Sequence, residues 1–360
     1  MRERAPRAEL ARWTAGPVAV AAGAVALTGA LAAASLWLGG YDPWRAAAAA
    51  AAGAFGSPEA VVSITLVRAV PLVLTGLAVA LAFRAGAWNI GAEGQLYAGA
   101  VAGVWVGLNG GALPGWLLVP LLLASAGAAG ALWAAVPILM RLRLGVSEVI
   151  TSLLMSFVGI DLAAYMVHGP LQEPRGVFPQ TAPIAEAARM PSLVPGTRLH
   201  VGALLALGAA VGLWWLFRHT RLGFQVRAVG ASRRAAEIAG RIDAGRVTLV
   251  AFLASGALAG LAGGVQVAGV TYALYEGLSP GWGYTAIAVA LLADLHPLGV
   301  LVTGLLFGAL DAGAAAMQRE AAVPAVWATA VQALVILAVL ALGRAQRQLS
   351  VAPASPLADV

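Results

Sequence analysis

Four polar side chains and three glycines interrupt an otherwise apolar part of the chain between residues 83 and 97, which reads FRAGAWNIGAEGQLY. In an uninterrupted membrane helix, each glycine would cost about 1 kcal/mol relative to alanine. A carboxylate near the bilayer centre would cost roughly a further 3 kcal/mol. Such costs are accepted where the backbone breaks and either lines a polar cavity or is covered by protein. The polar residues are Arg84, Asn89, Glu93 and Gln95, and the backbone-break glycines are Gly86, Gly91 and Gly94.

This pattern has two interpretations. In the functional one, a broken membrane segment near 84–95 lies beside a permeation path that Asn89, Glu93 and Gln95 line. In the other, a short cytoplasmic hairpin joins two ordinary spans, and composition does not choose between them because glycine is common in membrane helices. Weaker pathway candidates are Asp161, Thr285 and Asp311. A single polar group in a span is as often a contact between helices.

The composition is that of a membrane protein. Of the 360 residues, 61% are hydrophobic and 11% are charged, too few polar residues to cover a soluble globule of this size. The absence of cysteine excludes disulfides and thiolate metal sites. The chain also lacks lysine, which the Walker A loop requires to hold nucleotide phosphates, so it carries no ordinary P-loop ATPase site. The four histidines have no ligand spacing, and no metal site is expected.

The apolar runs predict an all-α polytopic protein with about ten transmembrane helices. They fall at about 17–38, 61–82, 92–108, 115–138, 149–167, 201–217, 247–270, 282–293, 298–317 and 324–342. We expect a cytoplasmic tail at 1–16, one permease domain at 17–346 and a disordered tail at 347–360. The first run also has features of a signal peptide, but the many spans after it favour an uncleaved helix.

The arginines set the orientation. With both termini inside, 16 arginines lie on the cytoplasmic side, five lie outside and one lies in a span. This asymmetry supports cytoplasmic termini, and it explains the basic pI without nucleic acid as a partner. The periplasmic loop at about 169–199 contains six prolines, which argue against one long helix there. It is either a connecting loop or a contact for an external partner.

The longest cytoplasmic loop, at about 218–246, contains seven arginines and two acidic residues. Ser232 is suited to be the N-cap of a short helix from Arg233 to Ala239, with Gly240 as its stop, and Asp243 is suited to cap the next membrane helix. The simplest explanation is that the loop sets topology by its charge alone. A capped helix is more structure than that purpose needs.

Three segments resemble the permease subunits of bacterial ABC importers for simple sugars and nucleosides. Phe83–Gln95 is similar to the family's FRAGLxNIGAEGQ stretch, Ala228–Val247 to its AVGxNxxAAxxAGIxxxR segment, and Gly281–Gly299 to its GxGFTAIAVALLGxxxPLG motif. The resemblance covers about 61–342. The chain departs from the family at 231–234, at Arg241 and at 294–296, which affects the expected choice of ATPase partner and the expected gating.

The resemblance implies a type II ABC importer-like permease in a bacterial inner membrane. Its expected partners are an ABC ATPase that binds the ATP, a paralogous second permease and an external substrate-binding lipoprotein. The permease itself would bind no cofactor. The resemblance also assigns an ATPase-coupling helix, which comprises Ser232, Arg233, Arg234, Ala235, Ala236, Glu237 and Gly240.

Two other functions remain as alternatives. A secondary, ion-coupled transporter of a small polar solute also uses broken helices, and its proton relay would draw on Glu93, Asp161 and Asp311. An intramembrane hydrolase needs a Ser/Lys, Ser/His or His-Glu arrangement, and the sequence has neither lysine nor an H-E-x-x-H motif. The sequence does not identify the solute.

Overall fold

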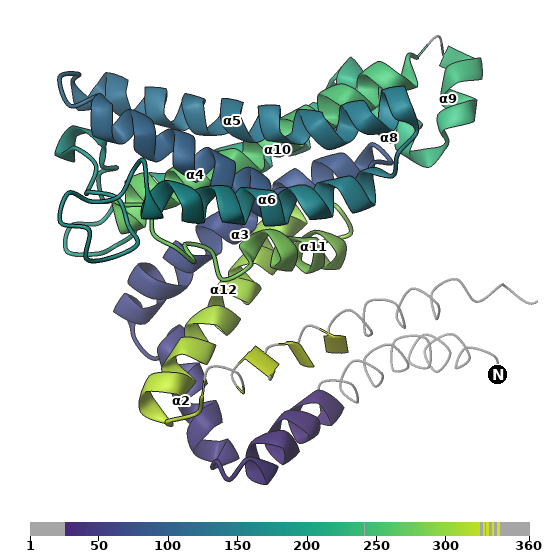
Figure 1. The fold of residues 1–360 in the computed structure, drawn as a ribbon. Coiled ribbons are helices and arrows are strands. Elements are labelled where there is room, and N and C mark those ends of the chain that lie inside the picture. The colour runs from purple at the N-terminus through teal and green to yellow at the C-terminus, as the bar shows by residue number, and fades with distance from the viewer. Residues whose placement is uncertain are drawn as a thin grey trace, which may run out of the picture. The chain divides into compact units, whose positions relative to one another are not determined.

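The computed structural model describes residues 26–240, 242–324, 327, 329–330, 333–334 and 337–338. In this part of the chain the regular secondary structure is helical, and the helices are joined by loops that contain isolated bridges (Figure 1). It forms two compact units. The larger is Ser57–Ala309, and the smaller combines the described residues of Met1–Gly56 and Leu310–Val360. Each unit is considered by itself below.

Within the described residues, six helical segments are long and apolar enough to cross a membrane. They are η1–α3 (Ala60–Arg84), α5 (Gly115–Leu144), α6 (Glu148–His168), α7 (Gly202–His219), α10–η3 (Ala244–Thr271) and α12 (Pro297–Glu320). A multi-pass membrane protein is therefore confirmed, but the count of ten spans is not.

Three of the predicted spans account for part of that difference. The predicted span at 282–293 is the helix α11 (Trp282–Leu292), whose 11 residues extend only about 16 Å, half of a 30 Å hydrocarbon core. The predicted first span is described only from residue 26, as a helix at Ala26–Leu38, and the predicted tenth span lies mostly outside the described residues.

The centre of the larger unit is built from α4 (Ala92–Asn109), α5 and α10, whose backbones meet at glycines. A β-carbon added to Gly99 of α4 would collide with the carbonyl oxygen of Gly260 of α10. A β-carbon added to Gly130 of α5 would collide with the carbonyl oxygen of Gly256. Small residues allow membrane helices to approach this closely, and van der Waals packing then holds them together.

The proline-rich loop between α6 and α7 packs against the end of α10–η3 rather than extending into solvent. The amide of Thr181 donates to the carbonyl of Leu274 and that of Met190 to Ala268, each at 2.8 Å. A single 3₁₀ turn, η2 (Glu186–Ala188), is its only helical piece, as the prolines predict. His200 closes the loop in a fully buried position, and burial lowers the pKa of its ring to about 4.

The smaller unit begins with Ala26–Leu38 and α2 (Pro43–Phe55). Asp42 caps α2 by accepting from the amide of Trp44 at 2.9 Å. The guanidinium of Arg45 donates to the carbonyl of Glu320 at 3.1 Å, which ties α2 to the end of α12.

Candidate functional site

The interruption predicted near 84–95 is present, and it is buried. Helix α3 (Leu66–Arg84) has Ala85 as its C-cap residue, and Gly86 adopts a left-handed conformation with φ of 73°. The amide of Ala87 then donates back to the carbonyl of Ala82 at 3.0 Å, which is a common way for a helix to end at glycine. Residues 87 to 90 have no regular secondary structure, and α4 begins at Ala92.

Asn89 is the centre of a closed hydrogen-bond network within this break. Its side chain is 0% exposed and exchanges two hydrogen bonds with the side chain of Gln95, at 2.9 and 3.0 Å. It also donates to the hydroxyl of Ser255 on α10 and accepts from the amide of Gly91. Every polar atom of the Asn89 amide therefore has a partner inside the protein, as burial requires.

Glu93 connects the first turn of α4 to the first turn of α11. Its carboxylate is 1% exposed and accepts from the amide of Gly283 at 2.6 Å. The hydroxyl of Ser279 accepts from the amides of Gly281 and Trp282. A carboxylate at a helix N-terminus is stabilised by the helix dipole and by the unpaired amides there. This arrangement explains how Glu93 is accommodated in an apolar bundle.

Helix α6 supplies hydroxyl groups to the other side of the break. Ser152 accepts from the amide of Ile90 at 3.2 Å, and Ser156 accepts from that of Gly94 at 3.4 Å. These serines lie one turn apart and therefore face the same way. The backbone of the break thus finds partners on α6, as a backbone within a membrane must.

An ion pair lies at one end of the break. Glu148, the first residue of α6, accepts from the amide of Trp88 at 3.2 Å and forms a 2.7 Å ion pair with Arg141 of α5. The carboxylate therefore joins α5, α6 and the break. The sequence did not predict Glu148 or the serines of this site, which are Ser152, Ser156, Ser255 and Ser279. The spacing of Ser152 and Ser156 by one helical turn was visible in the sequence.

The same end of the break meets the loop at 218–246 through α8 (Arg221–Ala231), a helix that the sequence did not predict. Gly230 of α8 lies so close to the break that an added β-carbon would collide with the carbonyl oxygen of Arg84. A β-carbon on Gly86 would in turn lie 3.4 Å from Gly230. The Arg84 side chain is held in place by a 2.8 Å hydrogen bond to the carbonyl of Leu295.

The predicted short helix after α8 is confirmed as α9 (Arg233–Gly240), with Gly240 as its last residue rather than the residue after it. The Ser232 hydroxyl caps it by accepting from the amide of Ala235 at 3.3 Å, and Arg233 pairs with Glu237 at 3.1 Å. Figure 1 shows α8 and α9 at one end of the larger unit, where α9 projects from the bundle. Asp243 caps α10 as predicted.

Exposed residues dominate the part of α9 whose burial is described. Ala236 is 7% exposed, whereas Ile238 is 78% exposed, and Arg234, Ala235 and Glu237 are also exposed. A single exposed isoleucine is normal on a protein surface, so exposure alone does not identify α9 as a contact surface.

The remaining predicted pathway residues do not join the cluster around Asn89. Thr285 is half-buried in the second turn of α11, and Asp161 is exposed on α6. Asp311 is half-buried in the part of α12 that belongs to the smaller unit. Among the residues that the structure describes, no three His, Cys, Asp or Glu side chains are grouped as metal ligands would be.

Comparison with known proteins supplies the family. Residues 61–340 match the model described as branched-chain amino acid transport system / permease component. The chain is 43% identical over 282 residues, covering 76% of this chain and 74% of the relative, to the glucose ABC transporter permease protein TsgB13 of Haloferax volcanii. It is 37% identical over 281 residues, 76% of this chain and 79% of the relative, to the guanosine ABC transporter permease protein NupP of Bacillus subtilis.

Bacillus subtilis has a second, less similar relative of this chain. The guanosine ABC transporter permease protein NupQ of Bacillus subtilis is 26% identical over 258 residues, covering 69% of this chain and 79% of the relative. All three relatives are described as permease proteins of ABC transporters.

Proposed function

The chain belongs to the permease-component family of branched-chain amino acid transport systems, and from this premise we propose that it forms the translocation pathway of an ATP-driven importer for a nucleoside or simple sugar. The solute class is carried over from the glucose and guanosine permeases among its relatives. An external binding protein delivers the solute, and the chain acts as a subunit without an ATPase site of its own. The missing lysine supports this division of labour, because a P-loop requires one.

The observation that carries the mechanism is the backbone contact between α8 and the break. Gly230 lies against Arg84 and Gly86, where α3 ends, and α9 continues from α8 after Ser232. A displacement of α9 by a bound ATPase therefore acts, through α8, on the backbone next to Asn89. Closely packed elements transmit such shifts because they cannot deform continuously.

Within this mechanism, Asn89 and Gln95 position the break, and the pathway is the space that changes when the break moves. Their side chains are fully paired within the protein in this conformation, so they offer no free hydrogen-bonding group to a solute. Glu93 has the corresponding role at the α4–α11 junction. Alternating access then consists of movement between the elements that meet at the break, with the solute contacting whichever side opens.

The proposed orientation places α8 and α9 in the cytoplasm, together with both termini, in a bacterial inner membrane. The support is the concentration of seven arginines in residues 218–246, since positive charge collects on the cytoplasmic side. The proline-rich loop then lies outside, where the binding protein docks. NupP and NupQ, two guanosine permeases of one bacterium, support pairing with a paralogous second permease.

The test is co-purification of the tagged chain from its native membrane, followed by uptake in proteoliposomes. We expect an ATPase and a second permease to co-purify with the wild type. Uptake should require ATP hydrolysis by the partner ATPase. Glu237→Arg and Arg234→Glu change only exposed charges of α9, and both should lose the ATPase while retaining the second permease.

The matched control is Arg143→Gln, an exposed arginine at the end of α5. It should retain both partners. A chain that purifies alone and transports without ATP would overturn the proposal in favour of a secondary transporter. Normal ATPase binding in both α9 variants would remove the coupling role of α9 while leaving the importer assignment in place.

A further inference from the structure

The side chain of Arg84 contacts three elements that the fold brings to the end of α3. Its guanidinium donates to the carbonyl of Leu295, after α11, at 2.8 Å. It also lies over the ring of Phe217 on α7, 5.3 Å from the ring centroid. Arg227 of α8 lies close enough to repel it electrostatically, and Asp294 lies close enough to attract it. One half-buried arginine therefore joins α7, α8 and the turn between α11 and α12.

The turn that accepts this hydrogen bond has an unusual backbone. Asp294 and Leu295 both adopt left-handed conformations, with φ of 54° and 56°. Aspartate tolerates such a conformation, whereas the β-carbon of a leucine comes too close to the following carbonyl oxygen. A backbone of this kind persists only where its surroundings hold it. Because Arg84 binds the Leu295 carbonyl, this arginine is part of what holds the turn in place.

Helix α11 is held at both of its ends by residues that flank the break. At its start, the amide of Gly283 donates to Glu93, in the first turn of α4. A β-carbon added to Gly283 would collide with the backbone of Glu93, so the two helices are in direct contact there. After its end, Leu295 accepts from Arg84, the last residue of α3. Since α11 has only 11 residues, a displacement of Arg84 acts on the whole helix.

On its other side, Arg84 meets the helix that leads to α9. Its carbonyl packs against Gly230 of α8, and its guanidinium lies near Arg227 of the same helix. Gly230 and Arg227 are three residues apart and therefore share one face of α8. A shift of α8 thus changes the backbone contact and the repulsion between the two guanidinium groups at the same time.

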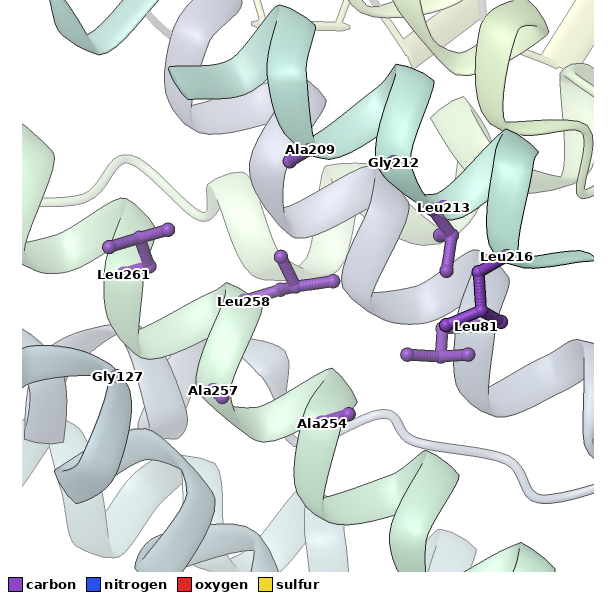
Figure 2. A pocket seen from close by; sticks show the side chains of 10 residues that line it. All are labelled: Leu81, Gly127, Ala209, Gly212, Leu213, Leu216, Ala254, Ala257, Leu258 and Leu261. Atoms are coloured by element: carbon purple, nitrogen blue, oxygen red, sulfur yellow. The ribbon is translucent and has the colours of Figure 1, made fainter. Parts of the chain in front are cut away.

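The packing beside this contact is loose. An open apolar groove of about 410 Å³ lies between α7 and α10, and both Leu81 and Leu216 line it (Figure 2). Leu81 lies about one turn before Arg84 on α3, and Leu216 directly precedes Phe217 on α7. The glycine contacts among α4, α5 and α10 are tight by comparison. Movement at Arg84 is therefore opposed by fewer packed side chains than movement among those three helices.

We propose that Arg84 is a positioning residue that passes the movement of α8 to α11, so that α11 moves across the break when the partner ATPase binds ATP. The proposal rests on the importer function proposed above. A purely topological role for Arg84 fits the contacts less well. An arginine that only set orientation by its charge would need neither a 2.8 Å hydrogen bond nor the left-handed turn that accepts it.

The first test measures the movement of α11 in the complex of the full chain with its co-purifying subunits. Spin labels are attached at Leu291→Cys on α11 and Leu132→Cys on α5, both exposed, and the complex with the cysteine-free chain supplies the background. Electron spin resonance compares the distance between the labels without ATP and after trapping with ATP and vanadate. We expect a shift of about 2 Å when Arg84 is present, and none in Arg84→Gln.

The second test measures coupling in proteoliposomes that contain the complex and its binding protein, with radiolabelled guanosine or glucose as the probe. We expect Arg84→Gln to lower uptake at least tenfold while the ATPase rate stays within twofold, so that more ATP is consumed per imported molecule. A structural role would lower both rates together and leave their ratio unchanged. Arg84→Lys keeps the charge and a donor for the Leu295 carbonyl, although not the planar guanidinium, and should restore at least a third of the uptake.

The matched control is Arg143→Gln, at the exposed end of α5, which should change neither measurement. If Arg84→Gln does not assemble, Asp294→Asn removes an exposed charge that attracts Arg84 and should lower uptake per ATP two- to threefold.

Two results would overturn the proposal while leaving the importer function in place. One is an α11 that does not move when the wild-type complex is trapped with ATP. The other is a ratio of uptake to ATP hydrolysis that neither Arg84→Gln nor Asp294→Asn changes. A wild-type complex whose ATPase drives the import of neither probe would instead overturn the proposed function, and this proposal with it.

Discussion

The break at 85–95 and the short helix α9 both combine polar residues, small residues and glycine. They differ in burial and in where their hydrogen bonds go. In the break, Asn89 and Glu93 are buried and bonded to α10 and α11. In α9, Ser232 and Glu237 are exposed, and their bonds stay within the helix. The polar groups of the break join different helices within the bundle, whereas those of α9 face solvent and are accessible to another protein.

The largest effect is expected from Asn89→Ala. It removes four hydrogen bonds and leaves the buried Gln95 side chain and the Gly91 amide unsatisfied, at a cost of roughly 3–5 kcal/mol. The apparent melting temperature of the purified complex should therefore fall with the uptake rate. The control is Asn109→Ala at the other end of α4, where the amide is exposed and bonds only to Trp105. Unchanged melting with lost uptake would mean that Asn89 serves the solute rather than the fold.

Acid should destabilise the proline-rich loop between α6 and α7. Burial lowers the pKa of His200 to about 4, whereas the ring in an unfolded chain has a pKa of about 6.5. The unfolded chain therefore binds the proton first, so stability is full above pH 6.5 and falls, by about 3 kcal/mol at most, as the pH drops towards 4. The hydrogen-exchange protection factors at 181–200, which correct for the intrinsic exchange rate at each pH, should fall between pH 6.5 and 5. His200→Gln should remove most of that pH dependence, and an unchanged dependence would exclude His200 as the cause.

Ser232→Ala should have a smaller and local effect. The loss of the N-cap costs about 1 kcal/mol of helix stability, and it affects α9 alone because the bond lies within that segment. Hydrogen exchange in 233–240 should accelerate about fivefold while the rest of the larger unit is unchanged. Thr220→Ala, which removes the N-cap of α8, is the comparison. It should affect the break as well, because α8 contacts Arg84. Equal and purely local effects would argue against transmission through α8.

The smallest effect on stability is expected from Glu237→Arg. The Arg233–Glu237 pair is exposed and contributes about 0.3–0.5 kcal/mol. Melting should therefore change very little, while ATP-dependent uptake should fall at least tenfold if α9 contacts the ATPase. Loss of melting stability comparable to that of Asn89→Ala would show that α9 is part of the folded core, and the contrast between the two regions would fail.

The sequence predicted those features that depend on local chemistry. Glycine spacing located the break, and Ser232 and Asp243 were identified as caps because capping involves only neighbouring residues. Features that depend on tertiary packing were missed. The short apolar run at 282–293 was counted as a span, whereas the helix α11 that it forms has 11 residues, too few to cross a membrane. Ser152, Ser156 and Ser255 became relevant only when the fold placed them beside the break.

The glycine contacts among α4, α5 and α10 imply that a transport cycle has a stationary frame. Because Gly99, Gly130 and Gly260 bring the three backbones together, these helices cannot slide past one another without colliding. The displacement must fall on elements outside this frame. Since the chain contains no cysteine, introduced cysteine pairs can test this directly. A disulfide between α4 and α10 should leave uptake intact, whereas one that ties α8 to α3 should stop it.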